Sequence, residues 1–257
     1  SLTINSIAHL GGSLFYSSNL GVLSKKTNDK NNWKSSYPIQ IEKTDFRSFE
    51  TSYYLDIKNK KDTSLLIPSE DGLFLLKNDK LKHITKKIVF LRALQSKKDP
   101  SIVYLSTNKG LALLKYPSSK FSDIHYITQV KSVVLKIIED YLGNIWVSTS
   151  TDGFYYLQRN KGHFKVLYHF EQTGEKSNID FAFQQNDNIL FIYKSSLWSF
   201  NLKTYQVCNS TGSLPEYLQS KDVTMLAHYR DSTFWYFYFD EDTPMPCQVI
   251  GSTFPNY

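Results

Sequence analysis

The sequence predicts an all-β fold, a β-propeller of six recognisable four-stranded blades, and three observations carry this prediction. A unit of short apolar strands recurs at intervals of 38 to 51 residues, its turns place Asp, Asn and Gly at matching positions, and no helical apolar period occurs. Propeller blades repeat at about 40 to 50 residues, whereas leucine-rich repeats are roughly 20 to 29 residues long. One unit with apolar residues on both faces cannot bury them alone, so neighbouring units are required.

The clearest unit reads IIEDYLGNIWVSTSTDGFYYL and spans residues 137–157. A strand over Val133–Ile138 leads into it, and two more strands are expected at Ile145–Thr149 and Phe154–Leu157. Asp140 to Asn144 and Asp152-Gly153 separate these strands. Because Asp and Asn form local side-chain hydrogen bonds and Gly adopts positive φ, both breaks are predicted turns.

Further copies follow along the whole chain. The residues aligned with Trp146 are Phe15, Leu66, Tyr104, Leu190 and Trp235. The turn glycine recurs as Gly21, Gly72, Gly110 and Gly153, with Ser196 in its place once. The strands expected before each central strand are Ile4–Leu10, Ser52–Ile57, Ile88–Leu94, Val133–Ile138, Asp180–Phe183 and Val223–His228.

We interpret residues 1–257 as a single β-propeller domain, with blades at about 1–36, 37–80, 81–120, 121–160, 161–203 and 204–257. In this phasing the innermost strand of a blade precedes its repeated unit. The innermost strands expected are Tyr37–Ile41, His83–Ile84, Ile124–Ile127, Phe164–Phe170 and Thr204–Cys208. The first blade lacks such a strand. Either the tail Pro246–Tyr257 completes it and closes the ring, or a seventh blade lies outside the segment.

The unit at 137–157 resembles the two-component regulator propeller repeat. The pattern of that repeat consists of a Glu-Asp pair, a Gly-Asn turn, an Ile-Trp-Val-Gly-Thr strand and a Gly-Leu pair. The matching positions here are Glu139-Asp140, Gly143-Asn144, Ile145 to Thr149 with Ser148 in place of Gly, and Gly153-Phe154. A second segment, Gly212-Ser213-Leu214-Pro215 before Val223, is similar to the Gly-Leu-Pro-Ser-Asn turn of these repeats.

The resemblance implies an extracytoplasmic sensor domain of a Bacteroidetes-type hybrid two-component histidine kinase, a class of which many members sense glycans. Such sensors often carry two seven-bladed propellers and a β-sandwich before the membrane helix, and they dimerise to signal. This chain would then be the periplasmic part of an inner-membrane protein and a homodimer in its parent. It begins with Ser and lacks an apolar run of about 18 to 20 residues, so we interpret it as a segment.

The net charge of +6 does not predict a nucleic-acid partner. Lysines scattered over predicted turns carry nearly all of it, and the arginines are Arg47, Arg92, Arg159 and Arg230. Phosphate recognition favours the bidentate fork of Arg and a clustered basic stripe.

The two cysteines, Cys208 and Cys247, are expected at opposite edges of one blade. At a strand spacing of about 4.8 Å they would lie roughly 14 Å apart. Disulfide formation requires Cα atoms within about 7 Å. The sequence therefore predicts two unpaired thiols.

No catalytic motif, cofactor motif or metal site is found, so the segment is predicted not to be an enzyme. His163 and His169 lie about 20 Å apart along one strand, too far to share a metal ion. Asp240-Glu241-Asp242 lacks the spacing of a calcium loop. Glu139-Asp140 occupies a turn position of the repeat, which favours a structural role over a glycoside-hydrolase acid pair.

The candidate ligand-binding residues are Trp33, Asn31, Asn32 and Lys34, in the polar insertion Ser24–Ser36. We expect this insertion on the connection from an outer to an inner strand, beside the entrance of the central channel. An exposed indole there could stack on a sugar face while its polar neighbours bind hydroxyl groups. The alternative is that Trp33 only anchors its own loop.

These observations favour a non-catalytic, extracytoplasmic ligand-sensing propeller that responds to a glycan or another small polar ligand. A second hypothesis is a protein-interaction or dimerisation scaffold, which a symmetric interface above about 1,000 Å² would favour. A third is a propeller glycoside hydrolase or lyase. Two facing carboxyl groups about 5 to 9 Å apart would favour that enzyme.

Overall fold

A computed structural model represents the 257-residue chain. It describes residues 4–10, 13–18, 21–26, 37–38, 55–59, 62–77, 80–86, 88–116, 124–160, 163–171, 182–193, 196–214, 216–219, 222–230, 233–240, 243–247 and 252–253, with side chains between residues 64 and 219. The chain divides into two compact units, residues 1–145 with 157–166, and residues 146–156 with 167–257.

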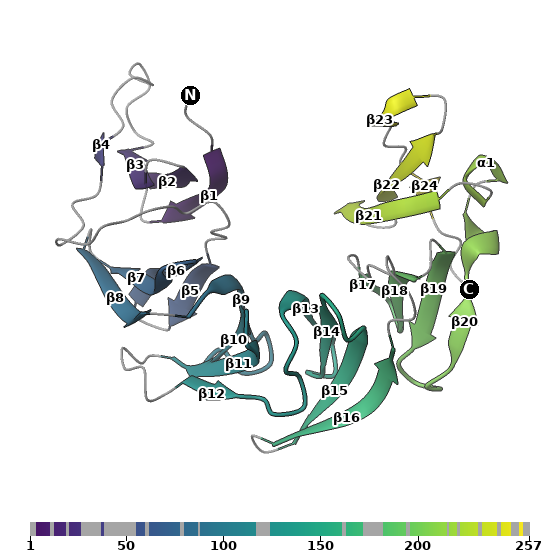
Figure 1. Ribbon diagram of the computed structural model, residues 1–257, viewed down its shortest axis with the longest axis horizontal. Coiled ribbons are helices and arrows are strands. Elements are labelled where there is room, and N and C mark those ends of the chain that lie inside the picture. The colour runs from purple at the N-terminus through teal and green to yellow at the C-terminus, as the bar shows by residue number, and fades with distance from the viewer. Residues whose placement is uncertain are drawn as a thin grey trace. The chain divides into compact units, whose positions relative to one another are not determined.

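The described strands of the first unit pair into antiparallel four-stranded sheets (Figure 1). The first sheet has the order β1 (Ile4–Leu10), β2 (Ser13–Ser18), β3 (Gly21–Lys26), β4 (Tyr37–Pro38). The second has the order β5 (Leu55–Asn59), β6 (Asp62–Ser69), β7 (Gly72–Lys77), β8 (Lys80–Lys86). The third is built from β9 (Phe90–Gln95), β10 (Ile102–Thr107), β11 (Gly110–Lys115) and β12 (Ile124–Tyr126).

The next sheet contributes strands to both units, in the order β13 (Val134–Glu139), β14 (Ile145–Thr149), β15 (Phe154–Asn160), β16 (His163–Phe170). The second unit continues with β17 (Ala182–Gln185), β18 (Asn188–Tyr193), β19 (Ser196–Asn201) and β20 (Val207–Asn209). Its last described sheet joins β21 (Asp222–Arg230), β22 (Thr233–Asp240) and β23 (Thr243–Cys247), and β24 (Ser252–Thr253) also pairs with β22.

The predicted repeat alignment is confirmed at its central strands. Phe15, Leu66, Tyr104, Trp146, Leu190 and Trp235 all lie on the second strand of their sheets. The prediction of an all-β fold made of four-stranded antiparallel sheets is therefore confirmed. The six-blade count and the single domain over 1–257 stay predictions.

The predicted phasing of the blades is wrong. The strands expected to open a blade instead pair as the fourth strands of the preceding sheets, namely β4 with β3, β8 with β7, β12 with β11 and β20 with β19. Likewise, β16 is the fourth strand of the sheet that β13 begins. A short apolar strand between two polar loops fits either neighbour, and the repeat pattern does not select one. The first sheet thus has its four strands without Pro246–Tyr257.

The expected placement of the cysteines changes with the phasing. Cys208 lies on β20 and Cys247 on β23, which belong to different sheets, so the premise of opposite edges of one blade is wrong. Cys208 is a free, exposed thiol. The side chain of Cys247 lies outside the described residues.

Two turn glycines show why the repeat requires this residue. Gly72 and Gly110 open the third strands of their sheets with φ of 135° and 118°. A Cβ atom would stand 1.9 Å from the Thr85 carbonyl oxygen at Gly72 and 2.1 Å from the Val130 carbonyl oxygen at Gly110. Only glycine tolerates both this backbone conformation and this close approach.

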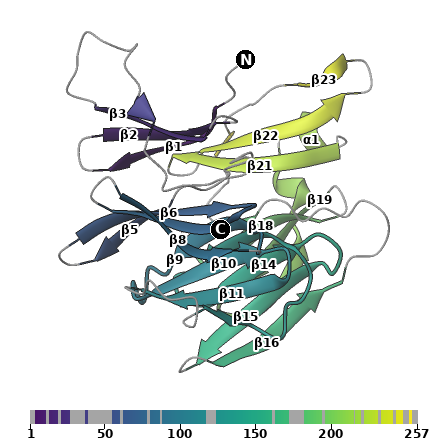
Figure 2. The ribbon, with the colours of Figure 1, turned by 60° about the vertical axis from the view of Figure 1, so that its left-hand side comes forward.

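The core of the first unit forms where one sheet packs on the next (Figure 2). The first strand β9 contacts β5 and β6, and β13 contacts β9 and β10. The buried cluster between β5–β8 and β9–β12 consists of Leu66, Leu73, Ile84, Ile88, Phe90, Val103, Leu105, Ala112, Leu114 and Tyr116. Each of these sheets thus buries its apolar face against the next.

The core of the second unit is aromatic. Trp146 is fully buried, and its ring lies 4.1 Å from that of Tyr156 and 4.9 Å from that of Phe200 on β19. Trp146 on β14 thus packs against the next sheet. Trp198 on β19 is half-buried and donates its indole N–H to the Tyr193 carbonyl at 3.1 Å. The side chain of Trp235 lies outside the described residues.

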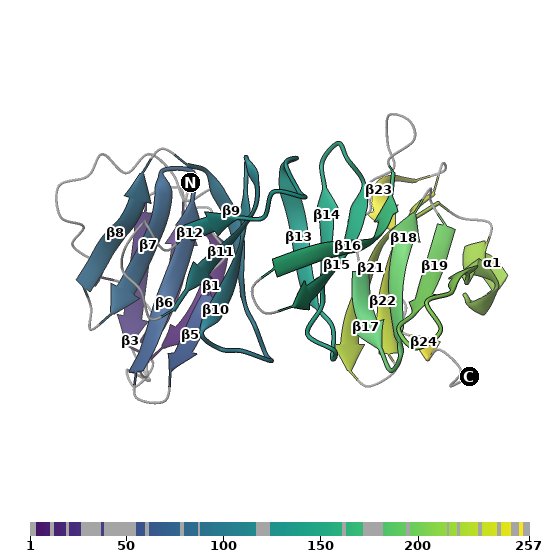
Figure 3. The same ribbon diagram turned by 90° about the horizontal axis from the view of Figure 1, so that it is seen from below.

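The connection between β20 and β21 contains the 3₁₀ helix η2 (Thr211–Ser213) and the short helix α1 (Glu216–Gln219), which Figure 3 labels. Gln219 on α1 donates its side-chain amide to the Leu214 carbonyl at 2.8 Å. Leu214 itself is buried. Leu214, buried between η2 and α1, therefore anchors this connection to the second unit.

Replacing Gly110 with Ala should lower the free energy of unfolding by about 3 kcal/mol, because the new methyl group meets a backbone carbonyl in a left-handed conformation. Urea unfolding measures the loss. Gly212→Ala is the matched control, since its Cβ would meet nothing within 4 Å. Equal stability of the two variants would contradict the turn requirement.

Candidate functional site

The acidic pair of the repeat serves the fold. Glu139 ends β13 and is buried, and its carboxylate accepts the Ser96 hydroxyl at 2.5 Å and the amide of Lys97. Asp140 accepts two amide groups of the turn that follows, at 2.9 and 3.0 Å. Both carboxylates are thus held by protein donors, as expected for a structural role. The contacts of Glu139 reach the loop after β9, so they tie neighbouring sheets together.

A second link joins the same sheets at the surface. The Arg159 guanidinium on β15 lies 2.7 Å from an Asp99 carboxylate oxygen and donates to the Tyr104 hydroxyl at 3.4 Å. The Ser101 hydroxyl lowers the pKa of Asp99 most, and the Arg159 hydrogen bond and charge lower it further, against the opposing effect of burial. The pair therefore stays ionised at neutral pH, and its charges are satisfied by each other.

In the second unit, Asp152 lies in the turn between β14 and β15 and contacts the side chains of Tyr155 and His169. The Tyr155 hydroxyl donates to its carboxylate, and the His169 ring stacks on Tyr155 with centroids 4.1 Å apart. Burial raises the pKa of Tyr155 above its ordinary value, and the hydrogen bond to Asp152 and its charge raise it further. This cluster closes the β14–β15 turn and holds a protonated phenol.

The first unit contains a pocket of about 330 Å³ between its β9–β12 strands and the beginning of β16. One wall carries Ile102, Leu113, Lys115, His125 and Tyr126. The turn after β12 adds Ile127, Thr128 and Gln129, and β16 adds His163 and Phe164. The volume lies at the low end of the range of small-molecule sites, about 300 to 1,000 Å³.

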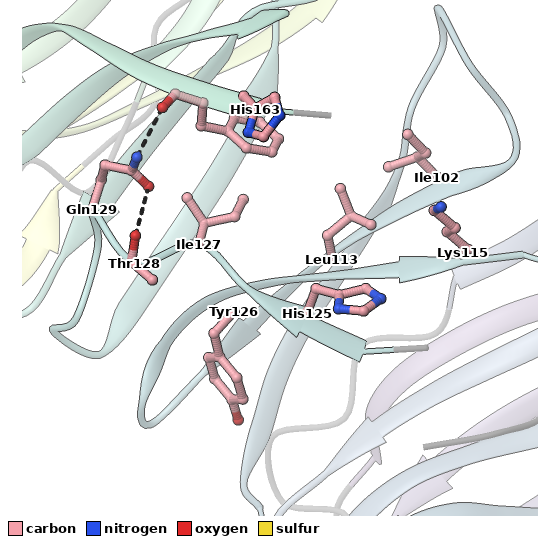
Figure 4. Close-up of a pocket in the computed structure, with 10 residues that line it drawn as sticks. Ile102, Leu113, Lys115, His125, Tyr126, Ile127, Thr128, Gln129 and His163 are labelled. Atoms are coloured by element: carbon pink, nitrogen blue, oxygen red, sulfur yellow. Dashed lines mark hydrogen bonds between the residues drawn. The ribbon is translucent and has the colours of Figure 1, made fainter. Parts of the chain in front are cut away.

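Strand pairing explains which side chains face the pocket. Leu113 pairs with His125, and Ile102 pairs with Lys115, so all four project from one face of the sheet. Figure 4 shows Tyr126 pointing away from the others, as strand alternation requires. Ile102, Leu113 and Ile127 are buried, whereas the imidazoles and the Lys115 side chain are exposed. The pocket thus has an apolar floor and a polar rim.

One glutamine spans the two walls. Gln129 donates its side-chain amide to the Phe164 carbonyl at 2.8 Å, and the Thr128 hydroxyl donates to Gln129 Oε1 at 3.4 Å (Figure 4). The Phe164 ring meets the buried Tyr104 edge-on, with centroids 6.3 Å apart. These contacts fix the position of β16 relative to β12 and so fix the width of the pocket.

The described side chains of the rim offer hydrogen-bond donors and include no pair of facing carboxyl groups. Among the described residues, no Asp or Glu lines the pocket, and no described carboxylate pairs with Lys115. The searched, described residues also contain no group of three or more His, Cys, Asp or Glu side chains placed to hold a metal ion. The arrangement suits reversible binding of a small polar molecule.

The predicted ligand-binding residues Trp33, Asn31, Asn32 and Lys34 lie outside the described residues. Their segment links β3 to β4 within one sheet, so the expected connection from an outer strand to the next inner strand is wrong. Sequence reasoning considered His163 only as a metal ligand and missed the rest of the pocket. The spacing of Lys115, His125 and His163 carries no motif that could have indicated it.

No protein-family model matches this chain, and no curated protein does. Solved structures do match its fold. The extracellular domain of BT4673 from B. thetaiotaomicron, described as part of a one-component system, is 12% identical with a TM-score of 0.60. That match covers 95% of this chain and 32% of the solved extracellular-domain chain, so this chain spans about a third of that domain's length.

Two further structures match over most of the chain. PorZ, a bacterial surface component of the type-IX secretion system of Porphyromonas gingivalis, is 11% identical with a TM-score of 0.57, over 93% of this chain and 32% of PorZ. YCF48 bound to a D1 peptide is 7% identical with a TM-score of 0.56, over 92% of this chain and 75% of YCF48.

At such identities the likeness establishes the fold alone, and these neighbours are β-propellers. The chain therefore shares the propeller fold of these structures. Within the part of the chain that the structure describes, no helix has the length and apolar character needed to cross a membrane.

Replacing Glu139 with Gln should lower the free energy of unfolding by about 2 kcal/mol. The buried carboxylate accepts two donors, and hydrogen bonds to a charged group contribute roughly 1.5 to 3 kcal/mol. Urea unfolding at pH 7 measures the change. Glu70→Gln removes the same charge from an exposed turn and serves as the control. If both variants unfold at the same urea concentration, Glu139 does not join the sheets.

The raised pKa of Tyr155 predicts a loss of stability above about pH 10. Between the unfolded and folded pKa values the unfolded chain binds fewer protons, so the free energy of unfolding falls as pH rises. Urea midpoints at pH 9 and pH 11 measure this fall. Tyr155→Phe should make it smaller, although not zero, because burial also raises the pKa of Tyr104. An unchanged fall would contradict the assignment.

Proposed function

We propose that this chain is a non-catalytic, extracytoplasmic ligand-sensing propeller domain of a two-component sensor, and that it responds to a glycan or another small polar ligand. The observation that carries the proposal is the shared fold with the extracellular domain of BT4673 over 95% of this chain. The two-component propeller motif at residues 137–157 supports the same assignment from sequence.

The described geometry supports the binding part of this proposal. The pocket in the first unit combines an apolar floor with exposed nitrogen donors, a combination common in small-molecule sites. The acidic pair of the repeat, Glu139-Asp140, is engaged by protein donors and is not free to act on a substrate. In the parent protein we further propose a periplasmic location, a homodimer, and membrane helices outside this chain.

A second candidate function is peptide binding on an interaction scaffold. One specific observation favours it, namely that YCF48, a neighbour of similar fold, is described in complex with a D1 peptide. A sensor and a peptide-binding scaffold differ in the class of ligand that stabilises the purified domain. That difference separates the two candidates in one assay.

The test is a thermal-shift screen of the purified chain against neutral and acidic saccharides, with a library of short peptides as the second arm. A ligand present at a hundred times its Kd adds about 2.7 kcal/mol of stability. For a domain of this size, that gain should raise the Tm by about 5 to 10 °C. A shift with peptides alone would favour the scaffold. Release of products from a saccharide, or no shift in either arm, would contradict a sensing role.

A further inference from the structure

The described side chains on the rim of the pocket include basic groups and no acidic one. Lys115, His125 and His163 approach it from β11, β12 and β16, and all three side chains are exposed. Within the described residues no acidic side chain lines the pocket. A cationic rim beside a concave surface attracts an anionic ligand, because the field of the lysine ammonium favours negative charge there.

The nitrogen atoms of this rim suit a carboxylate. Lys115 supplies an ammonium donor, and each neutral imidazole supplies one N–H donor, while a carboxylate has two oxygens that accept several donors. Hydrogen bonds between an ammonium and a carboxylate are short and about twice as strong as neutral ones.

The floor of the pocket limits the rest of the ligand. Ile102, Leu113 and Ile127 are buried beneath the rim, and the half-buried Phe164 stands on the opposite wall. An apolar floor opposite an aromatic ring favours a ligand with a flat, weakly polar face. The volume of about 330 Å³ fits a single ring better than an extended chain.

We propose that this pocket binds a small, ring-shaped carboxylate, whose carboxyl group meets Lys115, His125 and His163 while its ring lies over the Ile102–Leu113 floor. The proposal rests on the proposed sensing function and adds the site and the charge class of the ligand. Two sources share this chemistry, namely a uronic acid and a ring carboxylic acid without hydroxyl groups. Thr128 at the rim could donate to a hydroxyl of the former.

The pocket is open and small, so its affinity should be modest, with a Kd of about 1 mM. Ligand-observed saturation-transfer NMR titrations of the purified chain measure this range. The probes are glucuronate, glucose as its neutral counterpart, and cyclohexanecarboxylate as the acid without hydroxyl groups. The ionic strength is held constant with NaCl, because added salt would screen an exposed pair.

Lys115→Ala should weaken binding of the carboxylates about tenfold. Lys109→Ala is the matched control, because Lys109 is an exposed lysine at the turn of the same β10–β11 hairpin and does not line the pocket. It should change the Kd less than twofold. Glucose should bind at least tenfold more weakly than glucuronate to the unmodified chain.

Binding of either carboxylate with this dependence on Lys115 supports the proposal, and the preferred one identifies the source. Equal affinity for glucose and glucuronate, equal effects of the two lysine variants, or no binding in any arm would overturn it. Neutral saccharides that stabilise the chain independently of Lys115 would remove this inference and leave the sensing function in place. A chain that no ligand stabilises would remove both.

Discussion

The buried carboxylate of Glu139 is the contact on which the arrangement of the first unit depends. Removing an ionised group from water is costly unless hydrogen bonds replace its hydration. Here the replacements come from Ser96 and the Lys97 amide, residues of the preceding sheet. The hydroxyl of Ser106 on β10 makes a similar link to the Val134 carbonyl on β13. Apolar faces could slide over one another at little cost, whereas these directional bonds permit one register. Glu139 thus joins the two sheets, whereas Asp140 stabilises its own turn.

The position of the pocket follows from this register. With β13 fixed against β9 and β10, the fourth strands β12 and β16 are brought within reach of one another, and Gln129 bridges them to the Phe164 carbonyl. Tyr104 adds a second contact with β16, since it lies fully buried on β10 and its ring packs against the Phe164 ring. The hydrogen bonds of Glu139 and Ser106 and the side chains of the pocket rim are therefore linked through neighbouring residues of the same two sheets.

The central strands and turns could be predicted because residues close in sequence determine them. The pairing of the fourth strands and the pocket could not, because they depend on residues distant in sequence. Gly72 and Gly110 sit where backbone carbonyls leave no room for a Cβ atom, so the sequence marks these turns directly. Trp146 is buried because its strand is apolar on both faces. The fourth strands carry no such mark, because β4 and β20 are two and three residues long and could pair with either neighbour. The pocket was unpredictable for another reason, since its walls come from residues as distant as Ile102 and Phe164. None of these residues is unusual for its strand.

The pocket illustrates how the fourth strands of this chain contribute to a binding site. Ser148 on the second strand β14 is buried, and its hydroxyl has no hydrogen-bond partner among the described residues. The described fourth strands differ in length, from two residues in β4 to eight in β16. The described part of β12 pairs with β11 from Ala112 to Leu114, and Lys115 follows at the end of β11, where it lines the pocket. The exposed side chains of the pocket thus come from β11, β12, β16 and the turn after β12, whereas the bonds between the sheets come from β10, β13 and the loop after β9. Substitutions on the rim can therefore change the binding site without removing the bonds between the sheets.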